Sequence, residues 1–226
     1  MSSEGLSISF AGLPVRLLPS GAVLCEQSST LFVADVHLGK AASFRQLGQP
    51  VPKGTTSATL ARLTRDISAY SIRHLVVLGD LFHNQRMSSS IGTMTAIARW
   101  RQMQTDCQIT LVRGNHDLGL DSVADRLTVD LVEQPFGVGA FQCCHDLAEA
   151  QDPGTKGILA GHVHPVVVLR GLARDRVRLP CFVVTESTLL LPAYGSFTGG
   201  YEIKRRPGQT CYVLADTEVF KLPGPA

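Results

Sequence analysis

The chain has 226 residues, of which 44% are hydrophobic and 18% are charged, and its formal net charge is +2. This length is enough to bury the core of one domain, and the even composition predicts a single domain over residues 1–226. No apolar run approaches the roughly 20 residues that cross a bilayer, and the N-terminus lacks the regions of a signal peptide, so we expect a cytoplasmic protein without a membrane anchor.

The first half of the chain alternates strands with helices. Buried strands are expected at residues 31–34, 74–78 and 108–112, and apolar residues at helical spacing predict helices over residues 55–70 and 88–103. This alternation is typical of a βαβ arrangement.

The second half of the chain contains short apolar runs separated by turn residues, which predict strands. The expected strands are residues 140–144, 158–160, 166–169, 177–179, 181–184, 189–191 and 210–215. Together the two halves predict an α/β (α+β) fold in which two packed sheets are flanked by helices.

The six cysteines show no CxxC spacing, and most lie in apolar runs, so we expect buried, reduced thiols. Cys143 and Cys144 precede His145, but neighbouring side chains of a strand point to opposite faces. A zinc-thiolate site is therefore not expected at this pair.

Polar clusters follow several of the apolar runs, and five of the seven histidines lie in or beside them. The clusters are Asp35-Val36-His37, Gly79-Asp80, Gly114-Asn115-His116-Asp117, His145, and Gly161-His162-Val163-His164. Their position at the ends of successive strands allows carboxylates, imidazoles and one amide to converge on metal ions.

Oxygen and imidazole ligands together suit Mn²⁺, Fe or Zn²⁺ better than Ca²⁺, which prefers oxygen alone. Asp35 and His37 can reach one ion if the strand opens into a loop there, and Gly39 permits such a turn. Asp80 could bridge two ions through its two oxygens, and Asn115 offers a neutral oxygen ligand. The remaining positions are expected to be filled by His145, His162 and His164.

Two divalent ions about 3.5–4 Å apart would lower the pKa of a bridging water and hold the attacking and leaving oxygens of a phosphodiester. His116 is expected to face the substrate and protonate the leaving oxygen, with Asp117 orienting it. His83, three residues beyond Asp80, is expected to line the site, whereas His74 begins a strand.

The composite pattern D-x-H, G-D, G-N-H-[DE], a lone H and G-H-x-H resembles that of the calcineurin-like metallophosphoesterases and spans residues 35–164. The resemblance implies a four-layer α-β-β-α sandwich and hydrolysis by a metal-bridging hydroxide, with His116 as the catalytic histidine. It also implies two ligand sets: Asp35, His37 and His164 for one metal, Asn115, His145 and His162 for the other, and Asp80 as the bridge.

A narrower likeness covers nearly the whole chain. Residues 35–40, 44–45, 51–55 and 191–200 are similar to a bacterial subfamily of ligase-associated DNA damage response endonucleases. This likeness implies a Mn²⁺-dependent endonuclease or phosphodiesterase of DNA repair, with DNA as substrate and a DNA ligase and a helicase-like protein as partners.

Three basic groups could neutralise DNA phosphates without reading sequence, or could be solvated hairpin charges. The groups are Lys40, Arg45 and Lys53; Arg170, Arg174, Arg176 and Arg178; and Lys204-Arg205-Arg206. Arg45 is the residue among them that we expect to bind substrate. No basic surface interleaved with aromatic residues is visible, so base stacking is not expected.

Two other functions fit part of the pattern. One is a phosphatase or phosphodiesterase for nucleotides or other small phosphoesters, and cleavage of DNA would distinguish it from a nuclease. The other is a scaffold without activity, which the retention of every ligand position disfavours.

Overall fold

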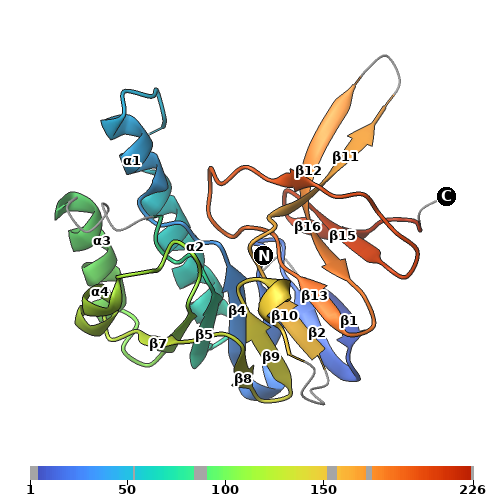
Figure 1. The fold of residues 1–226 in the computed structure, drawn as a ribbon, viewed down its shortest axis with the longest axis horizontal. Helices are drawn as coiled ribbons and strands as arrows, with labels where there is room; N and C mark the ends of the chain where they lie inside the picture. The colour runs from blue at the N-terminus through green and yellow to red at the C-terminus, as the bar shows by residue number, and fades with distance from the viewer. Residues whose placement is uncertain (1–4, 53, 84–90, 152–156, 172–174, 225–226) are drawn as a thin grey trace.

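Two β-sheets pack face to face, and the α-helices lie on the outer side of the first sheet (Figure 1). The computed structural model describes residues 5–52, 54–83, 91–151, 157–171 and 175–224.

The first sheet has seven strands in the described residues, in sequence order across the sheet. Strands β1 to β4 pair antiparallel, and β4 to β7 pair parallel. The strands are β1 (Leu6–Phe10), β2 (Leu13–Leu17), β3 (Val23–Cys25), β4 (Thr30–Ala34), β5 (His74–Leu78), β6 (Gln108–Val112) and β7 (Asp130–Val132).

The second sheet has nine strands in the part of the chain that the structure describes, in the order β14-β11-β12-β13-β10-β9-β8, with β15 on β12 and β16 on β15. The strands are β8 (Phe136–Val138), β9 (Phe141–Cys144), β10 (Gly157–Ala160), β11 (Pro165–Arg170), β12 (Arg176–Val184), β13 (Thr188–Leu190), β14 (Tyr201–Glu202), β15 (Thr210–Ala215) and β16 (Glu218–Lys221).

All four α-helices of the described residues precede the second sheet in the sequence. They are α1 (Lys40–Gln46), α2 (Thr55–Ala69), α3 (Ile91–Gln102) and α4 (Asp121–Arg126), and two 3-10 turns cover Glu26–Ser28 and Leu147–Glu149.

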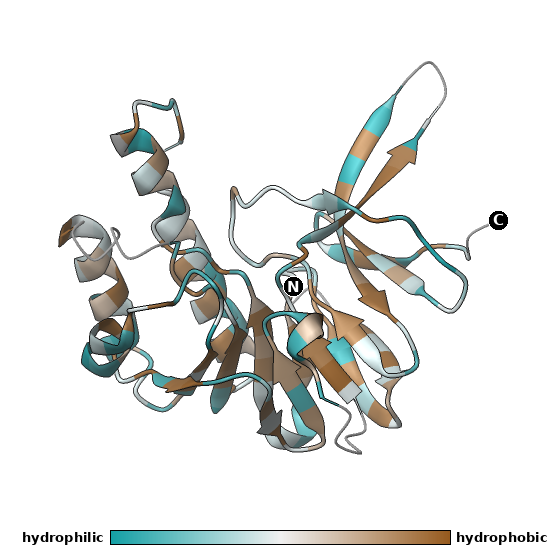
Figure 2. Ribbon diagram, viewed as in Figure 1, coloured by the Kyte–Doolittle hydropathy of each residue, from teal (hydrophilic) through white to brown (hydrophobic). Residues whose placement is uncertain are grey.

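Successive side chains of β4 and β5 point to opposite faces and enter two different cores. Leu31 and Val33 pack beneath the helices with Leu63 of α2. Phe32 packs between the sheets with Phe182 of β12. Because both faces are covered, the parallel strands are mostly hydrophobic, as the brown centre of Figure 2 shows.

The α/β sandwich predicted from the sequence is confirmed, with differences in detail. The expected strands at 177–179 and 181–184 are one strand, β12, in which Pro180 pairs with Val166 of β11. The helix expected over 88–103 is observed as Ile91–Gln102, and residues 88–90 lie outside the described residues. The α-helices and strands that were not expected are α1, α4, β1 to β3, β7, β8, β14 and β16.

The cysteines are all free and buried, as predicted. Among the helices that the structure describes, none combines the length and apolar character that crossing a bilayer requires.

Candidate metal centre

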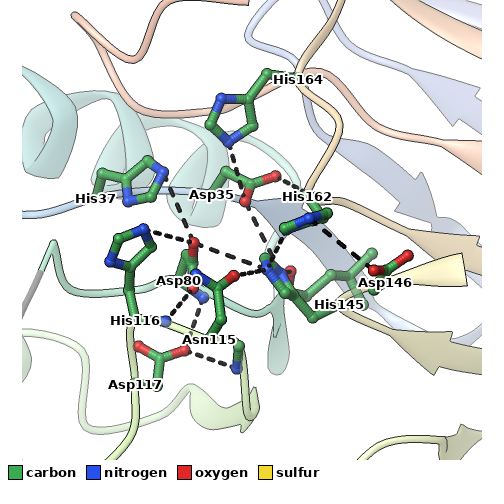
Figure 3. A network of polar contacts seen from close by, with 12 residues as sticks. Asp35, His37, Asp80, Asn115, His116, Asp117, His145, Asp146, His162 and His164 are labelled. Carbon is green, nitrogen blue, oxygen red and sulfur yellow. Dashed lines mark hydrogen bonds and ion pairs between the residues drawn. The ribbon is translucent and has the colours of Figure 1, made fainter. Parts of the chain in front are cut away.

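The polar clusters meet at one edge of the sandwich. Parallel strands β4, β5 and β6 end in register at Ala34, Leu78 and Val112, so the clusters that follow them lie side by side. In the second sheet, β9 and β10 end in register at Cys144 and Ala160, which brings the remaining histidines to the same edge (Figure 3).

Several predicted ligands have a left-handed backbone, which non-glycine residues adopt at a cost of about 1 kcal/mol or more. This conformation turns the chain sharply at each strand end, so that side chains two residues apart can face one site. The residues concerned are Asp35 (φ 53°), His37 (φ 48°), Asp80 (φ 52°), His162 (φ 67°) and His164 (φ 48°).

One group of possible ligands consists of Asp35, His37 and His164, each offering an atom within 4.8 Å of the others. His164 Nε2 lies 3.1 Å from Asp35 Oδ1. These are the three residues that the resemblance implied for one metal.

A second group consists of Asp35, Asp80 and His145, again within 4.8 Å of one another. Asn115 Oδ1 lies 2.9 Å from His145 Nε2, and His162 Nδ1 lies 3.0 Å from the same nitrogen. The structure therefore brings the other three implied ligands together beside Asp80.

Asp80 lies between the two groups. Its Oδ2 is 3.9 Å from His37 Nε2 and 3.7 Å from His145 Nε2, while its Oδ1 accepts a hydrogen bond from the His116 backbone N–H at 2.9 Å. Burial raises the pKa of Asp80, although the positive charges of the neighbouring histidines act to lower it. This position suits a bridging carboxylate, but Asp35 also belongs to both groups.

The donor set fits divalent cations. Asp35 is fully buried, and Asp35 Oδ1 and His37 Nδ1 are buried without a hydrogen-bond partner in the described residues. Burial first, and then the charge of Lys40, lowers the pKa of His37 to about 2, so this imidazole is neutral. Buried carboxylates need a compensating cation, and neutral imidazoles are good metal ligands.

The His145 ring offers a lone pair to the same place. Its Nδ1 lies 3.1 Å from the Leu78 carbonyl oxygen, which can only accept, so Nδ1 carries the proton. When the ring is neutral, Nε2 presents its lone pair toward Asn115 Oδ1. Two acceptors at this separation repel each other unless a cation lies against both.

His116 and His83 lie at the open side of the centre. The His116 side chain is 40% exposed, and its Nε2 is 3.9 Å from Asp80 Oδ2. The His83 ring stacks on His116 and also contacts the rings of Phe44 and His37. A substrate reaching the buried carboxylates from this side would meet these two imidazoles.

The basic residues that were expected to line the centre are engaged by backbone carbonyls or lie outside the described residues. Lys40 Nζ donates to the Thr198 carbonyl at 3.3 Å, and burial lowers its pKa. Arg45 Nη1 donates to the Pro52 carbonyl at 2.8 Å and, within the described residues, makes no hydrogen bond or ion pair with a proposed metal ligand. Lys53 and Arg174 lie outside the described residues.

Asp117 has contacts different from those expected. Its Oδ2 accepts from the backbone N–H groups of Asp80 at 2.7 Å and Gly114 at 3.0 Å, and its Oδ1 accepts from Phe82 at 3.4 Å. Burial is the main cause that raises its pKa to about 7. The carboxylate therefore orders the loops around Asp80, and these contacts give no support to a direct bond with the His116 ring.

Other residues that hold the site were not identified from the sequence. Gln134 Oε1 accepts from the backbone N–H groups of His145 at 2.7 Å and Asp146 at 3.2 Å. Asp146 Oδ2 lies 3.9 Å from His162 Nε2. By contrast, Gly79 belongs to a motif already seen in the sequence, and the structure gives the reason for it: a Cβ there would lie 2.1 Å from His145 Nδ1.

Comparison with known proteins agrees with this centre. The family model described as calcineurin-like phosphoesterase matches residues 28–145, and the chain belongs to that family. It is therefore a metal-dependent phosphoester hydrolase.

The crystal structure of the nuclease MPE from Pseudomonas putida matches 96% of this chain and 100% of its own, with 38% identity and a TM-score of 0.82. Yfce, a phosphoesterase from E. coli, matches at 16% identity and a TM-score of 0.43, over 83% of this chain and 88% of its own. Comparison with curated proteins gives no match.

Proposed function

We propose that the protein is a two-metal phosphodiesterase that cleaves DNA, acting as an endonuclease in DNA repair. The observation that carries this proposal is the convergence of two groups of Asp and His atoms, each within 4.8 Å, beside an exposed imidazole. The choice of nucleic acid as substrate is supported by the likeness to the Pseudomonas putida nuclease.

The proposed metal ligands are those predicted from the sequence, and Mn²⁺ is the proposed ion. Asp35, His37 and His164 would hold one cation, and Asn115, His145 and His162 the other, with Asp80 between them. When bound, such cations neutralise phosphate charge and supply an activated water.

The chain's own groups have separate roles around the scissile bond. His116, exposed and beside Asp80, would place a proton on the leaving oxygen. His83 would bind the substrate beside it, whereas Asp117 would act as a positioning residue through the backbone of Asp80. Arg45 would contact a phosphate farther along the substrate than the scissile one. Its guanidinium is held by the Pro52 carbonyl and, within the described residues, not by any of the proposed metal ligands.

We further propose that residues 1–226 act as one domain in the cytoplasm. The core between the sheets includes Phe32 and Val76 from the first sheet and Phe141 and Phe182 from the second. A DNA ligase and a helicase-like protein are the proposed partners, in keeping with the narrower sequence likeness.

The test is cleavage of labelled DNA by metal-stripped protein supplied with Mn²⁺. Single-stranded, duplex and flapped substrates are compared, with His116→Ala as the variant and Arg126→Gln, on α4, as the matched surface control. We expect cleavage that requires both Mn²⁺ and His116.

Hydrolysis of a small phosphodiester without cleavage of any DNA would reject the nuclease and favour a small phosphoester as substrate. Full DNA cleavage by His116→Ala would reject the assigned role of His116.

A further inference from the structure

A hairpin formed by β11 and the first half of β12 projects from the second sheet (Figure 1). We name it the β11–β12 arm and define it as residues 165–170 and 176–180; residues 172–174 lie outside the described residues. Beyond Pro180, β12 pairs with β13 and β15 in the body of the sheet.

The two faces of the arm differ in chemistry because strand side chains alternate between faces. One face carries the arginines, with the pairs Arg170↔Arg176 and Val168↔Arg178 in register. The opposite face carries apolar side chains that continue the small core around Cys181. Figure 2 shows this alternation as hydrophilic and hydrophobic bands along the outer part of β12.

The arginine face places two like charges opposite each other. Arg170 and Arg176 lie directly opposite each other and both are exposed, and like charges in that position destabilise a strand pair. Neither forms an ion pair within the described part of the chain. An anion between the two guanidinium groups would remove the repulsion.

The base of the arm is joined to the metal centre. Pro165 of β11 directly follows His164, and the Tyr201 N–H donates to the His164 carbonyl at 2.9 Å. Arg178 donates to the Gly200 carbonyl, and Gly195, at the start of that loop, donates to the Asp35 carbonyl at 3.1 Å.

The arginines therefore form a line that begins near the centre and leads away from it. Arg178 lies opposite Val168, four residues after His164, or about 13 Å along an extended strand. Arg170, six residues after His164, is about 20 Å along the same strand. Arg176 and Arg178 are two residues apart, about 7 Å along β12.

We propose that the arginine face of the β11–β12 arm binds successive phosphates of a nucleic-acid strand whose scissile bond lies at the metal centre. A regular row of guanidinium groups matches a polymer that carries one negative charge per unit, and guanidinium binds phosphate through two parallel hydrogen bonds. The contact reads no bases, so it holds and orients the strand without selecting a sequence. This inference rests on the proposed nuclease function.

The test uses the double variant Arg170→Gln/Arg176→Gln and the single variant Arg178→Gln. The control is again Arg126→Gln, which removes one surface charge from α4, a helix far from the arm (Figure 1). Binding of a fluorescent single-stranded oligonucleotide is followed by anisotropy over a range of salt concentrations, with Mn²⁺ present and each substitution placed in the His116→Ala background to prevent cleavage.

We expect the double variant to weaken binding about tenfold or more and to reduce the salt slope by about 1.4, because each lost single-strand phosphate contact removes about 0.7. Arg126→Gln should match the parent protein in both measurements. Removing the like-charge pair should leave the melting temperature unchanged or higher, which excludes unfolding as the cause.

Equal affinity and salt slope in the arm variants and their parent would overturn the proposal even if the wild-type enzyme cleaves DNA. If the arm variants bind DNA normally but lose binding to a labelled poly-glutamate chain, the arm instead binds an acidic protein. If the wild type hydrolyses bis(p-nitrophenyl) phosphate but neither binds nor cleaves DNA, the nuclease function fails and this inference fails with it.

Discussion

The ring of His83 stacks on the ring of His116, with centroids 5.7 Å apart and planes inclined by 28°. Phe44 stacks on His83 in turn, with centroids 5.9 Å apart and planes inclined by 25°. An exposed imidazole beside the buried carboxylates thus has its orientation set by ring contacts, while its backbone N–H is bound to Asp80.

His83→Phe separates stacking from polar contact. A phenyl ring can still stack on His116 but has no nitrogen to bind a phosphate, so we expect DNA cleavage to fall as far as in His83→Ala. The melting temperature of His83→Phe should stay close to that of the wild type. Near-normal cleavage by His83→Phe alongside loss in His83→Ala would show that His83 acts only by packing.

Metal binding should stabilise the fold because Asp35 and Asp80 are buried carboxylates. A cation at about 100 times its dissociation constant adds about 2.7 kcal/mol to the free energy of unfolding, so Mn²⁺ should raise the melting temperature and a chelator should reverse this. Asp35→Asn should lose most of the increase, whereas Asp121→Asn, at an exposed ion pair with Arg113, should keep it. An equal Mn²⁺ effect in Asp35→Asn would remove Asp35 from the ligand set.

Two glycines with nearly the same φ angle provide a test of close packing at the centre. Gly79 (φ +75°) has no room for a Cβ beside His145, whereas Gly12 (φ +78°) has nothing within 4 Å. Gly12→Ala should cost only the left-handed conformation, about 1 kcal/mol. Gly79→Ala should cost more, because His145 must move, and should abolish hydrolysis. If Gly79→Ala and Gly12→Ala lost the same amount of unfolding free energy, the close packing of Gly79 against His145 would be contradicted.

A buried carboxyl away from the centre should make stability depend on pH. Burial raises the pKa of Asp66 above its usual 3.8, despite the hydrogen bond from Tyr194 and the charge of Arg62. Between 3.8 and the raised pKa the native state binds more protons than the unfolded state, so this group lowers stability as pH rises through that window.

Asp66→Asn removes this titration. In urea unfolding at pH values on both sides of 3.8, the stability of the variant relative to the wild type should increase with pH and then level off. A difference that does not change with pH would show that the environment of Asp66 favours neither protonation state.

The sequence predicted the elements that carry the ligands better than those that do not. The runs ending at Ala34, Leu78 and Val112 are buried on both faces and so are mostly hydrophobic, a pattern that local inspection detects. By contrast, α1 and α4 have only seven and six residues, too few to establish a helical period.

At the site, sequence motifs predicted which side chains meet but not how the surrounding loops are held. Gln134 acts on the backbone of His145 from eleven residues away, and no spacing rule indicates such a contact. Asp117 follows His116, which suggested that it orients that ring, yet its carboxylate points to the backbone of Asp80 and Gly114.

Because the ligands come from both sheets, the centre cannot be completed until His164 has been synthesised. A chain emerging from the ribosome presents Asp35, His37 and Asp80 early, but the partners of Asp35 include His164, which appears more than a hundred residues later. Domains fold as units during synthesis, so a truncated chain lacking the second sheet would leave Asp35 without His145 and His164. Asp80, by contrast, would keep His37 and His116. Cation capture would then distinguish chains that extend through His164 from shorter ones.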